Sequence, residues 1–224
     1  MGLTQRDLLD SLVQGMTPRK SEVEALIALG ERPRVVVALR KQMLEWSWKD
    51  EAAERLIELG DADAIGHIRN NILAPVVSRL AQKQKSENDW SRSSGLWGVP
   101  PPLWSVAEPT QTHILVSYLE GIVIEAVQRL ASGHKYTFEQ WSDSEGFSGV
   151  SGDWADLLDR IQKPVDALYH VRDPTVLPRL QRLLQIIPSS IVSVSGTSFR
   201  PRGTVEANEM RRPIEHLVIK LQKT

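Results

Sequence analysis

Two stretches of the chain decide the expected fold: EALIALGERPRVVVA at residues 24–38 and ERLIELGDADAIGHI at residues 54–68. They lie thirty positions apart and align without a gap. Gly30 and Gly60 each follow the last apolar position of a helical pattern, where a helix ends on a left-handed residue that glycine adopts without strain. A second apolar face begins directly afterwards, so each stretch predicts a helix, a tight turn and a second helix.

A third stretch, DALYHVRDPTVLPRL at residues 166–180, aligns with residues 54–68 and keeps their apolar positions. It departs at Arg172, which stands where the other copies have glycine. Pro174 fits the first turn of the following helix, where its missing N–H costs nothing. Pro178 predicts that this helix is bent or begins later in the sequence. The expected hairpin units are residues 20–50, 50–82 and 153–187, with approximate limits.

These units resemble the HEAT-like repeats of bacterial proteins, including the short type found in phycobilin lyases, and LGDADAI at residues 59–65 is the closest match. The resemblance covers a little under half of the chain, and an unrelated helical bundle is the alternative. It implies an all-α fold, a short right-handed α-solenoid or superhelix of stacked helical hairpins. We expect residues 1–224 to form a single domain of this type.

The segments outside the repeats are expected to add two inserted loops, at residues 86–112 and 133–152, because both are rich in small and turn-forming residues. Within residues 189–203 the alternation of apolar and polar residues predicts a short strand or an extended strap. The chain is expected to close with capping helices at residues 204–224, divided at Pro213 because proline cannot continue a regular helix.

The composition limits the class of protein. The chain has 224 residues, a formal net charge of −1 and no cysteine. Disulfides, cysteine nucleophiles and thiolate metal sites are therefore excluded, and the charge gives no general attraction to nucleic acid or anionic membranes. The N-terminal stretch is amphipathic and carries acids, which is not typical of a signal peptide, and no apolar run approaches the roughly 20 residues of a membrane span. We expect a cytoplasmic protein with no membrane partner.

Three tryptophans, Trp90, Trp97 and Trp104, follow one another at intervals of seven residues in the first inserted loop. Glycines and three consecutive prolines in this segment forbid a helical heptad and favour extended polyproline II structure. Tryptophan is enriched among binding hot spots, so these residues are candidate contacts for a partner. The alternative is that the indoles fold back and cover an open end of the helical stack.

Charge is segregated in the last third of the chain. Residues 139–159 contain six acids and no Lys or Arg, whereas residues 160–224 contain eleven Lys or Arg and five acids. Arginine binds carboxylate and phosphate well, so a binding surface is one interpretation, and a solvated face partly paired with the acids is the other. The candidate contact residues are Arg179, Arg182, Arg211 and Arg212.

No motif for catalysis is present: there is no Gly-rich phosphate loop, no His-Glu-x-x-His and no nucleophile elbow. Asp153, Asp156 and Asp159 lie at intervals of three at the start of a predicted helix, where the helix dipole alone accounts for them. We therefore predict no catalytic residue, no metal site and no cofactor, and the sequence does not favour an enzyme.

The sequence predicts a protein–protein interaction scaffold, either an adaptor or an assembly factor. Its partner is expected to bind a concave helical-repeat surface and the tryptophan-rich loop. The resemblance implies an alternative, a lyase or chaperone for a tetrapyrrole (bilin) ligand, which would act by positioning and needs no catalytic motif. A nucleic-acid-binding protein is the third and least favoured interpretation.

Overall fold

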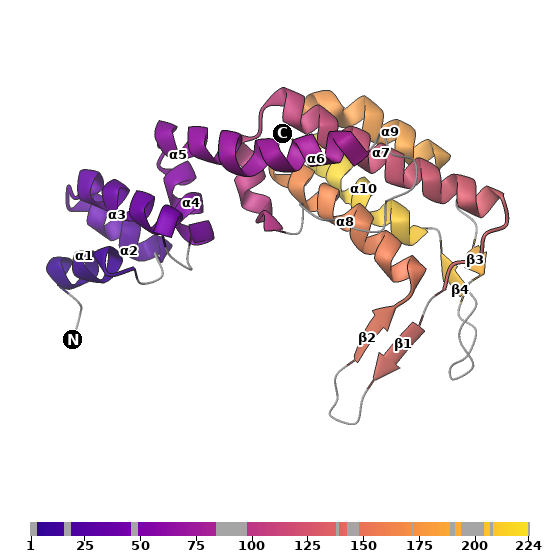
Figure 1. Ribbon diagram of the computed structural model, residues 1–224, viewed down its shortest axis with the longest axis horizontal. Coiled ribbons are helices and arrows are strands. Elements are labelled where there is room, and N and C mark those ends of the chain that lie inside the picture. Colours follow the sequence, from indigo (N-terminus) through magenta and orange to yellow (C-terminus); the bar gives the residue numbers. More distant parts are fainter. Residues whose placement is uncertain are drawn as a thin grey trace. The chain divides into compact units, whose positions relative to one another are not determined.

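The computed structural model describes residues 4–15, 19–45, 49–83, 98–137, 139–142, 148–171, 173–188, 191–193, 204–206 and 208–223. It divides into two compact units, one of residues 1–75 and 102–107 and the other of residues 76–101 and 108–224. The packed body of each unit is helical, which confirms the all-α class, and two short antiparallel strand pairs are added to it (Figure 1). No helix in these ranges is long and apolar enough to cross a membrane.

The first unit contains the two hairpins expected from the thirty-residue repeat. Its helices are α1 (Gln5–Val13), α2 (Lys20–Ala28), α3 (Arg32–Glu45), α4 (Lys49–Glu58) and α5 (Ala62–His67). Helix α3 packs against α1, α2 and α4, and α4 packs against α5. Leu26, Leu39 and Leu56, which lie on the apolar faces of α2, α3 and α4, are almost completely buried.

Both hairpins turn on the predicted glycine, and the two corners share one geometry. Gly30 and Gly60 have φ angles of 86° and 68°, in the left-handed region. Gly30 donates its N–H to the carbonyl oxygen of Ile27 at 2.9 Å, and the next residue donates to that of Leu26 at 3.0 Å. The same two bonds, with the same lengths, recur thirty residues later around Gly60. Each corner is therefore a Schellman motif, which confirms the prediction for this part of the chain.

Arginines of α3 connect the first hairpin to the second. Arg32 Nη2 donates to the carbonyl oxygen of Leu59 at 2.8 Å, at the end of α4. Arg40 binds the carboxylate of Asp61 through two bonds of 3.0 and 2.7 Å, and Asp61 also caps α5 by accepting the N–H of Ala64 at 2.9 Å. The hydrogen bond from Arg40 is the main reason that the pKa of Asp61 lies below its ordinary value.

Pro75 lies directly after a change in helix type. Helix α5 continues as the π-helical segment η1 (Ile68–Leu73) and then as α6 (Ala74–Lys83). In an α-helix the ring of a proline meets the carbonyl four residues earlier. The wider π-helical turn accommodates this ring, so the helical segment passes Pro75 without ending.

Four helices of the second unit form a ring: α7 (Pro109–Ala131), α8 (Asp153–Val171), α9 (Leu177–Ile186) and α10 (Asn208–Leu221). Helix α7 packs against α8 and α9, and α10 packs against the same two helices (Figure 1). The turn of the third predicted hairpin is present as the 3₁₀ segment η4 (Pro174–Val176), with Asp173 as its N-cap. However, the two helices that this turn connects, α8 and α9, lie opposite each other in the ring. The repeat pattern did not predict this arrangement.

The first inserted loop is shorter than predicted. Within residues 86–112, the prolines begin the 3₁₀ helix η3 (Pro101–Val106) rather than a polyproline II segment, and α7 begins at Pro109. The prediction of an extended segment was wrong because the fixed φ of proline, near −65°, fits a 3₁₀ helix as well. Proline at the first position of α7 and the capping box between Glu108 and Gln111 set the start of that helix.

The remaining irregular segments contain two strand pairs. Strands β1 (Glu139–Ser142) and β2 (Ser148–Ser151) pair within the second predicted loop, residues 133–152. Strand β3 (Ile191–Ser193), which was predicted as a strand or strap, pairs with β4 (Thr204–Glu206). The prediction of two capping helices in residues 204–224 was therefore wrong: a strand begins this segment, and the one helix α10 continues through Pro213.

Candidate functional site

The predicted tryptophan contacts do not form an exposed cluster in the described part of the chain. Trp90 and Trp97 lie outside the described residues. Trp104 belongs to the first unit and is only 1% exposed. Its segment is fastened there, because Arg69 Nε donates to the carbonyl oxygen of Val106 at 2.6 Å. Trp104 is thus a core residue, as in the alternative in which the indoles cover the helical stack.

Arg179, one of the four predicted arginines, connects two helices of the second unit. Its guanidinium forms a two-pronged ion pair with Glu120 of α7, in which Nε lies 2.9 Å from Oε1. Nη2 also donates to Ser117 Oγ at 2.6 Å, and Nη1 to the carbonyl oxygen of His113 at 3.3 Å. This set of bonds fixes α9 against α7, so Arg179 has a structural role in the ring.

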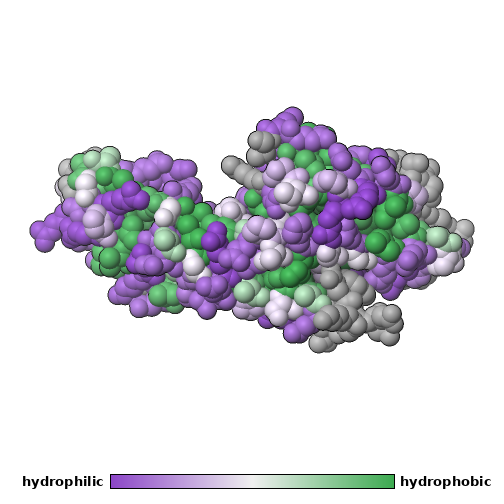
Figure 2. All heavy atoms as spheres, turned by 90° about the horizontal axis from the view of Figure 1, so that it is seen from above, coloured by the Kyte–Doolittle hydropathy of each residue, from purple (hydrophilic) through white to green (hydrophobic). Residues whose placement is uncertain are grey.

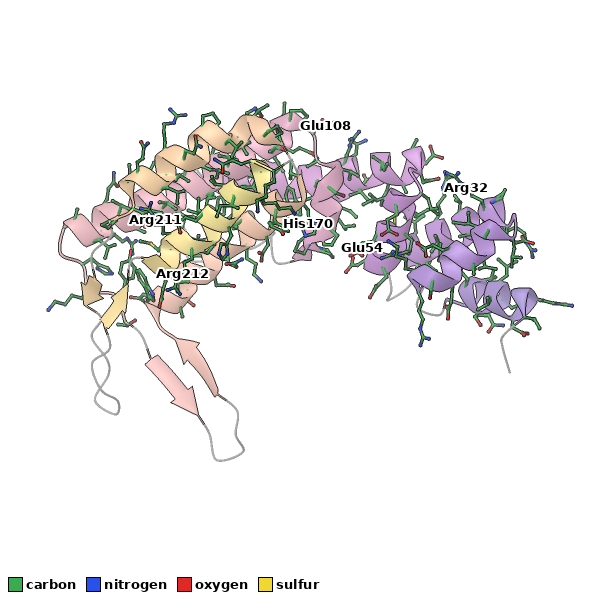
Figure 3. All side chains as sticks on the ribbon, turned by 180° about the vertical axis from the view of Figure 1, so that it is seen from behind. Arg32, Glu54, Glu108, His170, Arg211 and Arg212 are labelled. Carbon is green, nitrogen blue, oxygen red and sulfur yellow. The ribbon has the colours of Figure 1, made fainter. Side chains whose placement is uncertain are left out.

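Arg211 is held in a similar way, whereas its neighbour is exposed. Arg211 Nη1 donates to the carbonyl oxygen of Leu184 at 3.0 Å, and its Nε donates to Glu215 Oε1 at 2.5 Å. Arg212 and Arg182 have exposed side chains. Figure 3 shows Arg211 and Arg212 near the beginning of α10. Of the four predicted arginines, these two exposed ones are available to a partner.

Arg212 belongs to an exposed stripe along α10. His216, Ile219 and Lys223 follow it at helical spacing and are also exposed. The stripe carries basic side chains and one aliphatic side chain, with no Asp or Glu among its four members. It is the part of the described structure that corresponds best to the basic surface expected from the sequence.

A different face, on α3, carries the two most exposed large hydrophobic side chains among the described residues. Val37 is 68% exposed and Leu44 is 63% exposed. They are separated by two helical turns, roughly 10 Å along the axis, and therefore share one face with the exposed Pro33. Val13 and Leu29, which are at least half exposed, also belong to the first unit. Figure 2 shows hydrophobic residues between hydrophilic ones on one side of the molecule.

The charged side chains that flank this apolar stripe are balanced by acids. Arg34 Nη1 lies 3.2 Å from a carboxylate oxygen of Glu31, and Lys41 Nζ lies 4.0 Å from Glu45. Arg40 is paired with Asp61, as described above. The apolar side chains, rather than a net charge, therefore distinguish this face from the rest of the helix.

Val37 was not among the candidate contact residues predicted from the sequence, and it ends a run of three valines at residues 35–37. The structure buries Val35 and Leu39 completely. Three consecutive valines cannot all face the core, because each residue of an α-helix turns by about 100°. The run at residues 35–37 was thus the signal that one aliphatic side chain must point outward.

Comparisons of the chain with protein-family models, with curated proteins and with solved structures find no match. The resemblance to HEAT-like repeats therefore stays a prediction from the sequence.

Proposed function

We propose that the protein is an interaction scaffold or adaptor that binds another protein, and that the outward face of α3 is part of its binding surface. The observation that carries this proposal is the exposure of Val37 and Leu44 on one face of the helix. A single exposed aliphatic residue is common on a protein surface. When a partner covers two such residues on one helix face, the burial of each side chain contributes up to about 1.5–3 kcal/mol. A partner that covers both would gain a substantial part of its affinity there.

The architecture of the first unit supports the same proposal. Its hairpins have equivalent corners and are joined by Arg32 and Arg40, as expected for stacked hairpins of a short right-handed α-solenoid. Stacks of this kind present extended surfaces on which partner proteins bind. The exposed side chains of α3 lie on such a stack, so a scaffold function accounts for both the repeat and the apolar stripe.

The spacing of Val37 and Leu44 on α3 indicates which kind of structural element of the partner binds there. Val37 and Leu44 are separated by roughly 10 Å along the helix, which matches two helical turns of a second helix. Balanced charges around them favour a partner segment with polar flanks of both signs. We therefore propose an amphipathic helix, with apolar residues seven positions apart, as the bound element.

The double variant Val37→Glu/Leu44→Glu tests this function. Both side chains are exposed, so the variant is expected to keep the circular dichroism spectrum and melting temperature of the parent protein. Tagged parent protein, the double variant and Ile124→Glu, an exposed aliphatic change in the second unit outside the α10 stripe, are used to capture partners from the producing cells. The partner should be retained by the parent and by Ile124→Glu and lost by the double variant; an identical set of partners in all three would refute the proposal.

The exposed arginines are tested in the same assay with Arg182→Ala/Arg212→Ala. If they contribute contacts, as the sequence predicted, this variant weakens capture and makes it less sensitive to salt. Arg179 and Arg211 are unsuitable for the test, because their hydrogen bonds hold α9 in the ring and their replacement would disturb folding.

A further inference from the structure

The exposed stripe along α10, called the α10 stripe below, is turned directly away from the core of the second unit. Its members share one face of the helix over roughly 16 Å and are Arg212, His216, Ile219 and Lys223. The opposite face of the helix is buried and consists of Met210, Ile214, Leu217 and Leu221. The stripe is therefore a surface of the ring that a partner can reach.

The positive charge of the α10 stripe is not neutralised by the acids of its own helix. Glu209 Oε2 accepts an indole N–H of α8 at 2.8 Å, and Glu215 Oε1 accepts the Nε–H of Arg211 at 2.5 Å. Within the part of the chain that the structure describes, Arg212 and Lys223 form no ion pair. The helix dipole favours Lys223, just beyond the end of α10, but it does not account for Arg212 near the beginning.

Two side chains add an apolar centre to this basic surface. Ile219 is 48% exposed, and Tyr169 at the end of α8 is 43% exposed. Tyr169 lies beside α10, because Lys220 Nζ donates to its carbonyl oxygen at 2.7 Å and covers its ring at 2.9 Å from the centroid. An apolar centre with charged groups around it is the usual anatomy of a protein-binding surface.

This geometry favours an acidic helix over a nucleic acid as the bound element. Nucleic acids are held by many phosphate contacts and, when single-stranded, by bases that stack on aromatic rings. The stripe has only two Lys or Arg side chains, and Lys220 already covers one face of the Tyr169 ring. In contrast, the eleven positions from Arg212 to Lys223 correspond to about three turns of a second helix.

We propose that the α10 stripe, together with Tyr169, binds an acidic amphipathic helix of a partner protein. Carboxylates near the two ends of that helix pair with Arg212 and Lys223, and an apolar side chain between them covers Ile219. The surface belongs to the second unit, so this inference does not depend on the proposed binding face of α3 in the first unit.

The binding test uses the full-length protein at an ionic strength of about 0.15 M, so that general attraction between charges is screened. The probe is a synthetic helical peptide with glutamates at the two ends of one face, eleven positions apart, and leucine between them. An isomeric peptide of the same composition has its glutamates spread around the helix, and a single-stranded DNA serves as the nucleic-acid probe.

Fluorescence anisotropy measures the affinity for each probe. The first peptide is expected to bind saturably and about tenfold more tightly than the isomeric peptide or the DNA, because only its charges match the stripe. No saturable binding of this peptide, equal binding of the two peptides, or tighter binding of the DNA would overturn the proposal.

Two charge variants locate the site. Arg212→Glu/Lys223→Glu reverses both exposed cations of the stripe and should abolish binding of the first peptide. Arg79→Glu/Lys135→Glu makes the same charge change at exposed positions of the second unit outside α10, and it should leave the affinity within about twofold. Equal losses in the two variants would show non-specific attraction and refute the assignment.

Ile219→Asn tests the apolar centre. It should weaken binding of the first peptide about tenfold, which is about 1.4 kcal/mol, and leave the salt dependence of binding as in the parent protein. All of these substitutions are at exposed positions, so the variants should keep the circular dichroism spectrum and melting temperature of the parent. An unchanged affinity of Ile219→Asn would show that charge alone holds the peptide and would refute an amphipathic helix as the occupant.

Discussion

Alanine at Gly60 is expected to destabilise the protein, whereas alanine at Gly66 is expected to stabilise it. Each substitution adds one methyl group, and a Cβ at either position meets no atom within 4 Å. The two positions differ in backbone conformation, because Gly60 has a φ of 68° at a hairpin corner and Gly66 lies inside α5. The pair therefore isolates the conformational requirement of the corner from steric effects.

The expected changes in the free energy of unfolding follow from the backbone conformation at each glycine. A side chain in the left-handed conformation costs about 1–2 kcal/mol, and about 0.4–1 kcal/mol of this is offset by the smaller entropy of the unfolded chain. Gly60→Ala should thus lower the free energy of unfolding by about 0.5–1 kcal/mol. Gly66→Ala should raise it by about 0.8–1 kcal/mol, since alanine is the better helix former. The two variants should differ by about 1.5–2 kcal/mol.

Urea unfolding followed by far-UV circular dichroism measures this difference. With a slope of about 1–3 kcal/mol per molar urea, the midpoints of the two variants should be separated by about 0.5–2 M. Gly30→Ala should behave like Gly60→Ala, because its φ of 86° places it at the equivalent corner. Stabilisation by alanine at Gly60, of the size seen at Gly66, would refute the assignment of Schellman corners and with it the repeat.

Three further substitutions test contacts within the units. Asp61→Asn should cost about 1 kcal/mol at pH 7. Because the folded-state pKa of Asp61 is lowered, this contribution is fully present above the ordinary pKa of about 3.9 and is lost as the pH falls through the folded-state pKa. The free energies of unfolding of parent and variant, measured in urea at decreasing pH, should therefore differ down to the ordinary pKa and approach each other only below it. Trp154→Phe removes the hydrogen bond to Glu209 and should cost about 1.5–3 kcal/mol in thermal unfolding, and a change below about 0.5 kcal/mol would contradict the bond. Gly152→Ala should cost about 1–3 kcal/mol in urea unfolding. Gly152 has a φ of 101°, and a Cβ added there would lie 2.5 Å from the backbone oxygen of Thr137. An unchanged urea midpoint would contradict this close approach of the two backbone segments.

The elements that the sequence predicted well are those set by local chemistry. Gly30 and Gly60 end helices because a left-handed residue closes the last turn, and this requirement is visible in a few neighbouring residues. Asp61 caps α5 through a similarly local bond, which is typical of an aspartate directly before a helix. Such features do not depend on what packs against them, so the two hairpin corners of the first unit could be predicted from the sequence.

The features that the sequence did not predict depend on distant parts of the chain. The third repeat has its corner, but the ion pair of Arg179 with Glu120 places α9 beside α7 rather than beside α8. The conformation of the prolines before Trp104 was likewise decided by burial of that indole, since proline alone permits two conformations. A cavity of about 290 Å³ between α7 and α8 likewise combines residues about thirty positions apart, and no local pattern connects them.

The proposed function requires that the outward face of α3 contacts a partner protein. A photo-crosslinking amino acid placed at Val37 tests this claim directly in the producing cells, with the same group at Ile124, an exposed aliphatic position of the second unit, as the control. We predict one discrete cross-linked product at Val37, of the mass of this chain plus one partner, and none of that mass at Ile124. Only the uncross-linked protein at Val37, or the same products at both positions, would contradict the proposed binding face.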